Sequence, residues 1–589
     1  MLRQNHTLEG RGGSLREKTQ APQNRNRQGN ARRPCLREKP RRRHRRQRRQ
    51  AGSHDLERDR PEGFPRPNHD EGERRHGGDP LSPDSTREAR REILRRAGRL
   101  PGIFQRRGVD GGLDGETPRR RRTGGQVTNN FMRIINLNPE TDIGASAWFV
   151  NFEGHGLLMD SGMHPKLEGR AAMPLFKSIL NEELDAIAIS HCHHDHVGTL
   201  PVALRHFPKA HVMLPEQSYF IIERVLHNSV NVMTKQRDEL GLKEYPLYTH
   251  DEVDDIAPVF QGYRYNREVE WASFSKTRAG SSSPTLEFFD AGHTLGSAGI
   301  LLRGKKETLF YTGDVCFHDQ TILRAARFQD VKADVLIMET TRGNRPTPKN
   351  FTRQGEIERL TVAIQRALKR KGSVLIPSFA LGRTQEILAL LALLMREGKL
   401  KRQPVYIGGL GRVFTEIYDL EAHRTHRQHT NLQLHEAHNL VVLEKGQGEI
   451  MKLGGGRIFV LTSGMMAENT AAHDLAVRMA GDERQSIFFV GYADPSTPGG
   501  RLKAAKPGET FVFSPGAGRV TRRCDVQDFD LTAHANRDDL LDFVGQVSPR
   551  AVLLGHGDGA SRKWFEDQIR ARHPKIKIIQ PQPGKAVEV

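Results

Sequence analysis

The chain has 589 residues, and its formal net charge of +20 at pH 7 comes from 91 basic and 71 acidic side chains. Residues 1–131 hold 34 of the basic and 17 of the acidic residues, so the rest of the chain is nearly neutral. This distribution excludes a protein that coats nucleic acid with its whole folded surface. Four scattered cysteines exclude a disulfide framework and a Cys-rich zinc module.

Residues 1–131 are predicted to form a disordered, Arg-rich tail. They hold few aromatic residues and no sustained apolar period, so they cannot bury enough surface to offset the entropy of ordering. The run Arg41–Gln50 is compatible with a nucleic-acid or targeting patch. However, the segment uses 32 Arg and only 2 Lys, which favours upstream GC-rich DNA read as protein. We therefore expect the true start to be Met132.

No apolar run approaches the length of a membrane span, because the longest, Ile387 to Met395, is about half of what a bilayer requires. The first residues also lack the apolar core of a secretory signal. We therefore expect no membrane association and a cytoplasmic location.

From Met132 onward, short apolar strands alternate with helical patterns, which indicates a layered α/β fold. Several of these strands lead into a residue that can bind a metal or act as an acid. The strands and the residues that follow them are Leu157–Met159 and Asp160, Leu184–Ser190 and His191, Leu286–Phe289 and His293, Thr308–Thr312 and Asp314, Val335–Met338 and Glu339, and Ala551–Leu554 and His556. Since strand ends meet at one edge of a layered sheet, six such endings predict one shared site.

A second strand and helix series begins near residue 345. Its predicted strands are Ser373–Ile376, Val405–Ile407, Arg457–Thr462 and Ser486–Val490. A helix from about Arg383 to Arg396 has apolar residues around most of its surface and is expected to be buried. This series predicts a parallel sheet with helices on both faces, inserted between Glu339 and His556.

The strongest local pattern is His191-Cys192-His193-His194-Asp195-His196. Zinc-like cations favour imidazole nitrogen and carboxylate oxygen. His191 and His193 are placed to face one cation, and Asp195 and His196 are placed to face a neighbouring one. The alternative is a His-rich surface loop that binds metal only adventitiously, but the buried strand before this run favours the metal site.

Together these residues resemble the motifs of the metallo-β-lactamase fold, in its β-CASP branch of nucleic-acid nucleases. The resemblance is to RNA-processing members related to the endonuclease subunit of the cleavage and polyadenylation specificity factor. The segment IPSFALGRTQEIL, Ile376–Leu388, resembles a characteristic stretch of the inserted domain. The resemblance implies an αββα sandwich with an inserted Rossmann-like β-CASP domain. The implied domains are the tail at 1–131, the metallo-β-lactamase domain at 132–344, the β-CASP domain at 345–530 and a return segment of the first domain at 531–589.

The resemblance also implies the roles of the site residues. His191, His193 and His293 are expected to hold one cation, and Asp195, His196 and His556 the other, with Asp314 bridging both. Asp160 is expected to orient the ligand loop. Asp195, Glu339 and His534 are the expected catalytic groups, with His534 protonating the leaving oxygen and Glu339 holding its ring. The cofactor is expected to be two Zn²⁺, with Mn²⁺ as the alternative.

Each assignment has a simpler alternative. Asp160 would cap a turn, His293 would be a satisfied histidine at a strand end, and Asp314 would be a turn former. Glu339 would be a surface acid and His534 a helix cap. Arg383 would either contact substrate phosphate near a helix N-terminus or be a plain solvated side chain.

The function implied by the resemblance is cleavage of RNA phosphodiester bonds by a zinc-dependent hydrolase, in RNA processing or decay. His556 points to RNA, because DNA-repair members of the branch typically have Val at this motif. Single-stranded RNA is the expected substrate, and a homodimer is a further expected partnership. The alternatives are a DNA nuclease of the same branch, a small-molecule metallo-hydrolase such as a thioesterase or lactonase, and a non-catalytic subunit of an RNA-processing complex.

Overall fold

The computed structural model describes residues 132–275, 283–435, 440–443 and 455–589, which all lie in one compact unit of the chain. The predicted tail at residues 1–131 lies outside the described residues. Within these described ranges, no helix combines the length and the apolar character needed to cross a lipid bilayer.

Two seven-stranded sheets form the first part of the fold. The first has the strand order β22 (Ala586–Glu588), β1 (Arg133–Asn136), β2 (Trp148–Phe152), β3 (His155–Met159), β4 (Ala186–Ala188), β5 (His211–Pro215) and β6 (Phe260–Tyr263). The second has the order β21 (Lys577–Ile579), β20 (Ala551–Gly555), β11 (Val335–Glu339), β10 (Thr308–Tyr311), β9 (Ala298–Arg303), β8 (Thr285–Asp290) and β7 (Val269–Glu270). The last strand, β22, thus completes the sheet of β1 to β6, and β20 and β21 complete the sheet of β7 to β11.

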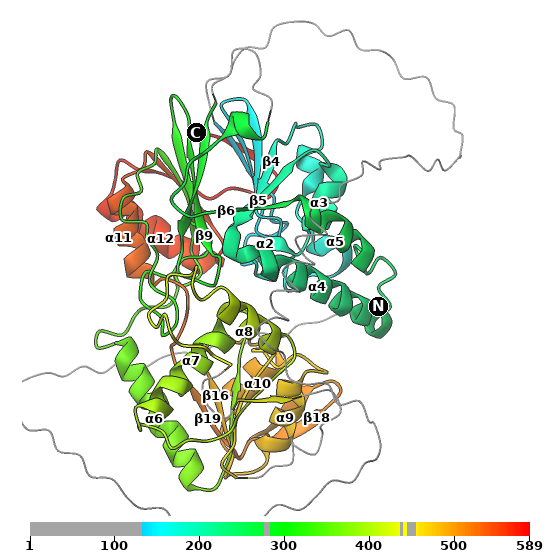
Figure 1. The fold of residues 1–589 in the computed structure, drawn as a ribbon, viewed down its shortest axis with the longest axis vertical. Coiled ribbons are helices and arrows are strands. Elements are labelled where there is room, and N and C mark those ends of the chain that lie inside the picture. The colour runs from blue at the N-terminus through cyan, green and yellow to red at the C-terminus, as the bar shows by residue number, and fades with distance from the viewer. Residues whose placement is uncertain (1–131, 276–282, 436–439, 444–454) are drawn as a thin grey trace, which may run out of the picture. The chain divides into compact units, whose positions relative to one another are not determined.

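Successive side chains of a strand point to opposite faces, so each sheet has an inner face toward the other sheet and an outer face toward helices. The two sheets and the helices outside them form four layers. In β11, Val335 and Ile337 pack between the two sheets, whereas Leu336 packs against the outer helices. Those outer helices are α11 (Arg537–Val547) and α12 (Gly559–Arg572). The other sheet is covered by α3 (Leu200–His206), α4 (Tyr219–Leu240) and α5 (His250–Ile256). Figure 1 shows α11 and α12 on one side of the strands and α3 to α5 on the other.

The predicted inserted parallel sheet is also present. Its six strands run in the order β14 (Leu440–Leu443), β13 (Val405–Gly408), β15 (Ile458–Leu461), β12 (Val374–Pro377), β16 (Ser486–Phe489) and β19 (Asp525–Asp528), and all neighbours are parallel. One face packs on α6 (Arg353–Lys369), α7 (Arg383–Arg396) and α8 (Leu410–Leu420). The other packs on α9 (Ala471–Ala480) and α10 (Pro498–Ala504), beside the hairpin of β17 (Thr510–Ser514) and β18 (Gly518–Thr521). The expected α/β architecture is confirmed.

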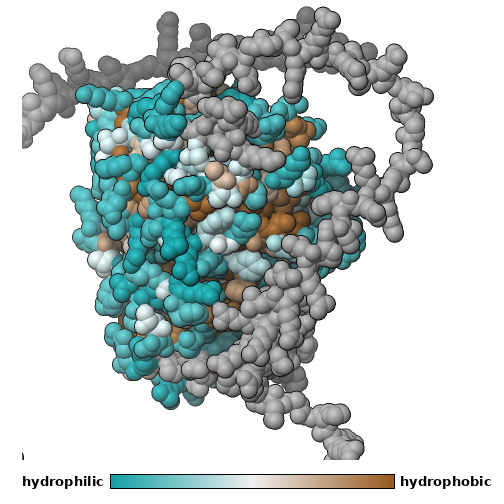
Figure 2. Space-filling model, turned by 45° about the horizontal axis from the view of Figure 1, so that its top comes forward, coloured by the Kyte–Doolittle hydropathy of each residue, from teal (hydrophilic) through white to brown (hydrophobic). Residues whose placement is uncertain are grey.

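Hydrophilic residues cover most of the described surface in the view of Figure 2, and hydrophobic residues appear there in smaller patches. The apolar residues are instead gathered in four buried clusters between the layers. The largest cluster includes residues of α3 to α5 together with residues of α7 and α8, so the inserted sheet and the first sheet share a hydrophobic core.

Candidate metal centre

The loops that follow the strands bring all seven predicted ligands together. His191 and His193 follow β4, and the short helix α2 (His194–Val197) carries Asp195 and His196. The other three ligands follow strands β8, β10 and β20, and they are His293, Asp314 and His556.

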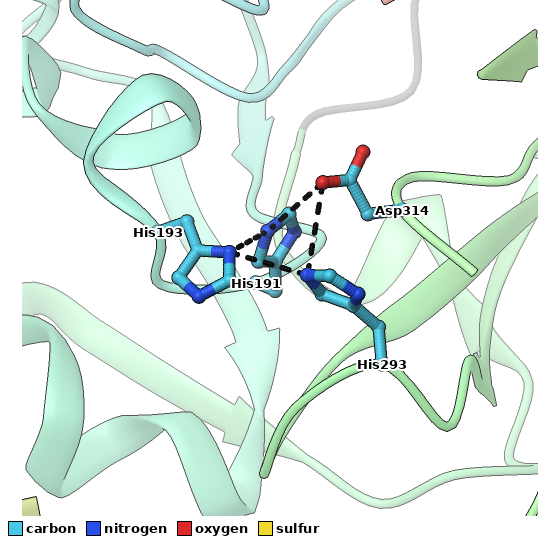
Figure 3. Close-up of side chains that lie close together, drawn as sticks. All are labelled: His191, His193, His293 and Asp314. Atoms are coloured by element: carbon cyan, nitrogen blue, oxygen red, sulfur yellow. Dashed lines mark hydrogen bonds and ion pairs between the residues drawn. The ribbon is translucent and has the colours of Figure 1, made fainter. Parts of the chain in front are cut away.

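The first group consists of three imidazoles and one carboxylate (Figure 3). His193 Nδ1 lies 3.1 Å from His191 Nε2 and 3.2 Å from His293 Nε2. Asp314 Oδ2 lies 3.6 Å from His191 Nε2 and 3.7 Å from His293 Nε2. Four potential ligand atoms from three separate loops therefore surround one point.

The opposite ring nitrogens of these histidines are occupied by hydrogen bonds. His191 Nδ1 lies 3.1 Å from Ser190 Oγ, and His293 Nδ1 donates to the Ala533 carbonyl at 2.8 Å. His193 Nε2 lies 3.3 Å from the Leu381 carbonyl oxygen. With the protons on these outer nitrogens, the three inner nitrogens face one another as bare lone pairs, which is the arrangement that a metal ion requires.

The second group contains Asp195, His196 and His556. His556 Nε2 lies 3.3 Å from Asp195 Oδ2 and 3.4 Å from His196 Nε2. His196 is oriented from behind by Asp160, whose Oδ2 accepts a hydrogen bond from His196 Nδ1 at 2.7 Å. The outer proton of His196 is therefore fixed and its Nε2 faces the group.

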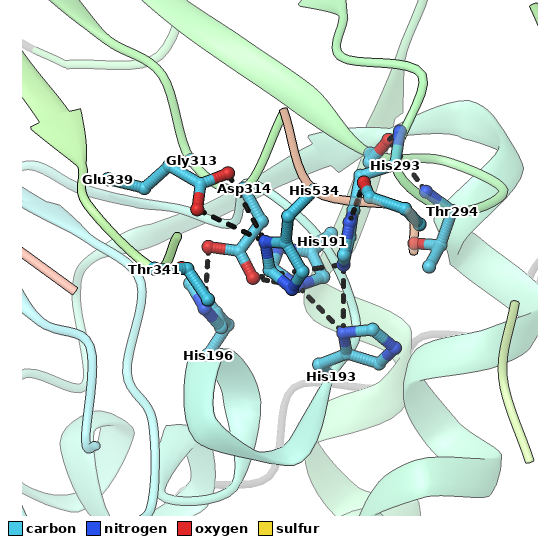
Figure 4. Close-up of polar contacts among 12 residues, drawn as sticks. His191, His193, His196, His293, Thr294, Gly313, Asp314, Glu339, Thr341 and His534 are labelled. Carbon is cyan, nitrogen blue, oxygen red and sulfur yellow. Dashed lines mark hydrogen bonds and ion pairs between the residues drawn. The ribbon is translucent and has the colours of Figure 1, made fainter. Parts of the chain in front are cut away.

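Asp314 lies between the two groups, and Figure 4 shows it between the histidines of the first group and His196 of the second. Its Oδ2 faces His191 and His293, whereas its Oδ1 lies 3.0 Å from His556 Nδ1 and 3.6 Å from His196 Nε2. Asp314 is buried, with 3% of its surface exposed. The negative charge of a buried carboxylate is costly unless positive charge lies beside it. The donor set of imidazoles and carboxylates therefore fits a pair of divalent cations.

Electrostatics favour cation binding at both groups. Burial, together with the His196 imidazole, lowers the pKa of His191 well below its usual value, and burial with the His534 imidazole does the same to His293. These rings are therefore neutral, which is the form that binds metal. At His556, burial acts to lower the pKa, but the Asp314 and Asp195 carboxylates together outweigh burial, so the pKa is raised well above its usual value. The second group thus attracts positive charge.

A second pair of predicted residues lies beside the first group. His534 Nδ1 lies 3.1 Å from Glu339 Oε2, and the ring centroids of His534 and His293 are 4.6 Å apart. Glu339 is 2% exposed, which excludes a surface acid, and its Oε1 accepts a hydrogen bond from the Val315 amide at 2.7 Å. His534 does not cap α11, whose N-cap is Asn536. Burial acts to lower the pKa of His534, but the Glu339 and Asp314 carboxylates together outweigh burial, so the pKa is raised.

Asp160 does more than form a turn. Besides His196, its carboxylate accepts hydrogen bonds from the Ser190 amide and hydroxyl, both at 2.7 Å, and from the Tyr311 hydroxyl at 2.6 Å. Its φ of +62° is in the left-handed region, where a non-glycine residue is held only by its surroundings. Tyr311 could not be predicted from the sequence, because its contact with Asp160 joins positions 151 residues apart.

The other residues of the His-rich run point elsewhere. His194 Nε2 lies 2.8 Å from Ser229 Oγ on α4, and the Cys192 thiol faces the Ser218 carbonyl. Arg383 is 7% exposed and donates to Gln320 and to the Leu531 carbonyl, so the solvated alternative is wrong. Gln320 in turn donates to the Gly292 and His293 carbonyls at 2.6 and 3.1 Å, which connects α7 to the His293 loop.

Comparison with known proteins gives three matches along the chain. Residues 141–377 match the family model of the metallo-beta-lactamase superfamily, and residues 384–502 match that of the Beta-Casp domain. Residues 519–581 match the model of the Zn-dependent metallo-hydrolase RNA specificity domain.

Individual relatives have low sequence identity to this chain but align with most of it. Cleavage and polyadenylation specificity factor subunit 3 of Dictyostelium discoideum is 24% identical over 79% of this chain and 58% of its own length. Endoribonuclease ysh-1 of Neurospora crassa is 25% identical over 77% of this chain and 55% of its own length. The chain thus spans little more than half of these relatives. Probable RNase MJ4 of Methanocaldococcus jannaschii is 27% identical over 76% of this chain and 99% of its own length.

Proposed function

Since the chain belongs to the metallo-beta-lactamase superfamily and carries a Beta-Casp domain, we propose that it is a metal-dependent ribonuclease. The single observation that carries the proposal is the position of Asp314 between two groups of bare ligand atoms. Superfamily membership and these clusters support divalent metal binding. The finer proposal is two Zn²⁺, with Mn²⁺ as the alternative, because the ligands are His-rich and include carboxylates but no thiolate.

The proposed ligands are those with converging lone pairs. His191, His193 and His293 would hold one cation, Asp195, His196 and His556 the other, and Asp314 both. When bound, such a pair supplies an acidified water and electrostatic stabilisation of the phosphodiester transition state. Asp160 keeps His196 in the tautomer with Nε2 free.

His534 is proposed as the general acid. Its Nδ1 proton is held by Glu339, and this carboxylate favours the imidazolium form, so His534 Nε2 carries the proton that the leaving oxygen needs. Asp195 is the third proposed catalytic group. Its side chain is 23% exposed, which allows its carboxylate to accept a hydrogen bond from the attacking water.

The proposed substrate is single-stranded RNA. The names of the relatives, an RNase and two proteins of RNA processing or cleavage, support RNA over DNA, as does the match to the RNA specificity domain. In this proposal, residues 132–344 and 531–589 hold the metal centre, and the Beta-Casp region at 345–530 positions the RNA substrate. A cytoplasmic location and a homodimer remain part of the proposal.

A cleavage assay on the full chain tests this function. The protein should cut 5′-labelled single-stranded RNA but not DNA of the same sequence, and a chelator should stop the reaction. Asp314→Ala and His293→Ala should each abolish cleavage while His435→Ala, on the exposed surface, should not. Cleavage of DNA alone would replace the proposal with a DNA nuclease, and cleavage by Asp314→Ala would refute the site.

A further inference from the structure

A third cluster of metal-ligating side chains lies on the surface, where α4 packs on α5. It contains Glu223 and His227, one turn apart on α4, and Asp254 on α5. His227 Nε2 lies 3.2 Å from Asp254 Oδ1 and 3.9 Å from Glu223 Oε1. All three potential ligand atoms lie within 4.8 Å of one another.

A chain of hydrogen bonds reaches His227 from the other side. Asn231 Oδ1 lies 3.3 Å from His250 Nε2, and in this orientation of the amide Nε2 carries the His250 proton, because an amide oxygen can only accept. His250 Nδ1, which lies 2.8 Å from His227 Nδ1, then accepts a hydrogen bond from His227. The two rings stack with centroids 5.1 Å apart, which holds this contact in place.

This chain of hydrogen bonds leaves neutral His227 with an unprotonated Nε2 that is directed at two carboxylates. Three acceptors that face one point repel one another unless a positive charge lies between them. That charge is either a proton on His227 or a metal ion. One imidazole and two carboxylates are ligands that zinc accepts, and the hydrogen-bonded outer nitrogen of His227 is typical of metal-bound histidine.

We infer that Glu223, His227 and Asp254 form a separate site for a divalent cation of the zinc class. The partly exposed position leaves the remaining coordination positions to water. A cation at this site links α5 to α4, two of the helices that cover the first sheet, and it does not depend on the proposed ribonuclease activity (Figure 1).

Zinc counting on the full chain tests the site. The wild-type protein, His227→Ala and a Glu223→Gln/Asp254→Asn double variant are equilibrated with the same buffered free Zn²⁺, and bound zinc per chain is measured by mass spectrometry. The matched control is His435→Ala, since His435 lies 3.5 Å from Glu416 but belongs to none of the three-ligand clusters of the described residues.

Both cluster variants should bind about one Zn²⁺ fewer than the wild type, and the control should bind as much as the wild type. RNA cleavage should be unchanged in all of them, because none of these residues belongs to the catalytic centre. Equal zinc content in the wild type and both cluster variants would overturn the inference and assign the positive charge to a proton on His227.

Discussion

Replacing Asp160 by Asn is expected to weaken the metal centre without changing any metal ligand. Both carboxylate oxygens accept hydrogen bonds, Oδ1 from the Ser190 amide and Oδ2 from the Ser190 hydroxyl, His196 Nδ1 and Tyr311. An amide has only one acceptor oxygen, so in either orientation its NH₂ group faces at least one buried donor.

The size of the effect follows from the unsatisfied donor. One unmet buried hydrogen bond costs about 1–3 kcal/mol, and each 1.4 kcal/mol corresponds to about tenfold. Since the displaced group orients His196, we expect Asp160→Asn to lower kcat/KM on single-stranded RNA, or metal affinity, by about 10- to 100-fold. Cleavage assays at a series of buffered Zn²⁺ concentrations separate the two effects.

A matched control is Asp185→Asn. Asp185 also accepts from a histidine ring, at 3.0 Å from His155 Nδ1, and from the Trp271 indole at 3.1 Å, but it lies in neither ligand group. This variant should lose stability and keep the zinc dependence of the wild type. The reasoning would be refuted if Asp160→Asn stayed within about twofold of wild type, or if both variants changed the zinc dependence equally.

Three further predictions concern other parts of the site. In Glu339→Gln the pKa of His534 should fall, so the alkaline limb of the pH–rate profile should move to lower pH; an unmoved limb would exclude His534 as the acid. In Arg383→Met the carbonyl oxygens of Gln320 and Leu531 lose a buried donor, which should lower the free energy of unfolding by about 1–3 kcal/mol for each unmet acceptor, measured by urea titration, and a total loss below about 1 kcal/mol would show the link to be dispensable. When free zinc is present at 100 times the Kd of a site, removing it with a chelator should lower the free energy of unfolding by about 2.7 kcal/mol for that site. An unchanged Tm after chelation would argue against bound metal.

Local patterns in the sequence were sufficient for much of this architecture. The inserted sheet and the buried helix α7 followed from apolar runs and their period, and β12, β13, β15 and β16 match the predicted strands to within one residue at each end. The convergence of His293, Asp314 and His556 on the His191 loop was predicted from strand ends at one sheet edge, but the structure brings it about with two stacked sheets, because β4 belongs to the first sheet and β8, β10 and β20 belong to the second.

The contacts that could not be predicted from the sequence depend on packing between distant segments. The Tyr311 hydroxyl reaches Asp160, and the Leu381 carbonyl lies beside His193, only because separate elements pack together. The burial of Arg383 has the same origin, since its partners lie 63 and 148 residues away. Contacts of this kind have no local period, so a single sequence carries no signal for them.

The central claim, that Asp314 bridges two cations, is tested most directly by a crystal structure of the zinc-loaded protein with data collected at the zinc absorption edge. The anomalous difference map should show two peaks about 3.5–4 Å apart, one beside each oxygen of Asp314. A map with no peak at Asp314, or with one peak that contacts only a single group of ligands, would contradict the account.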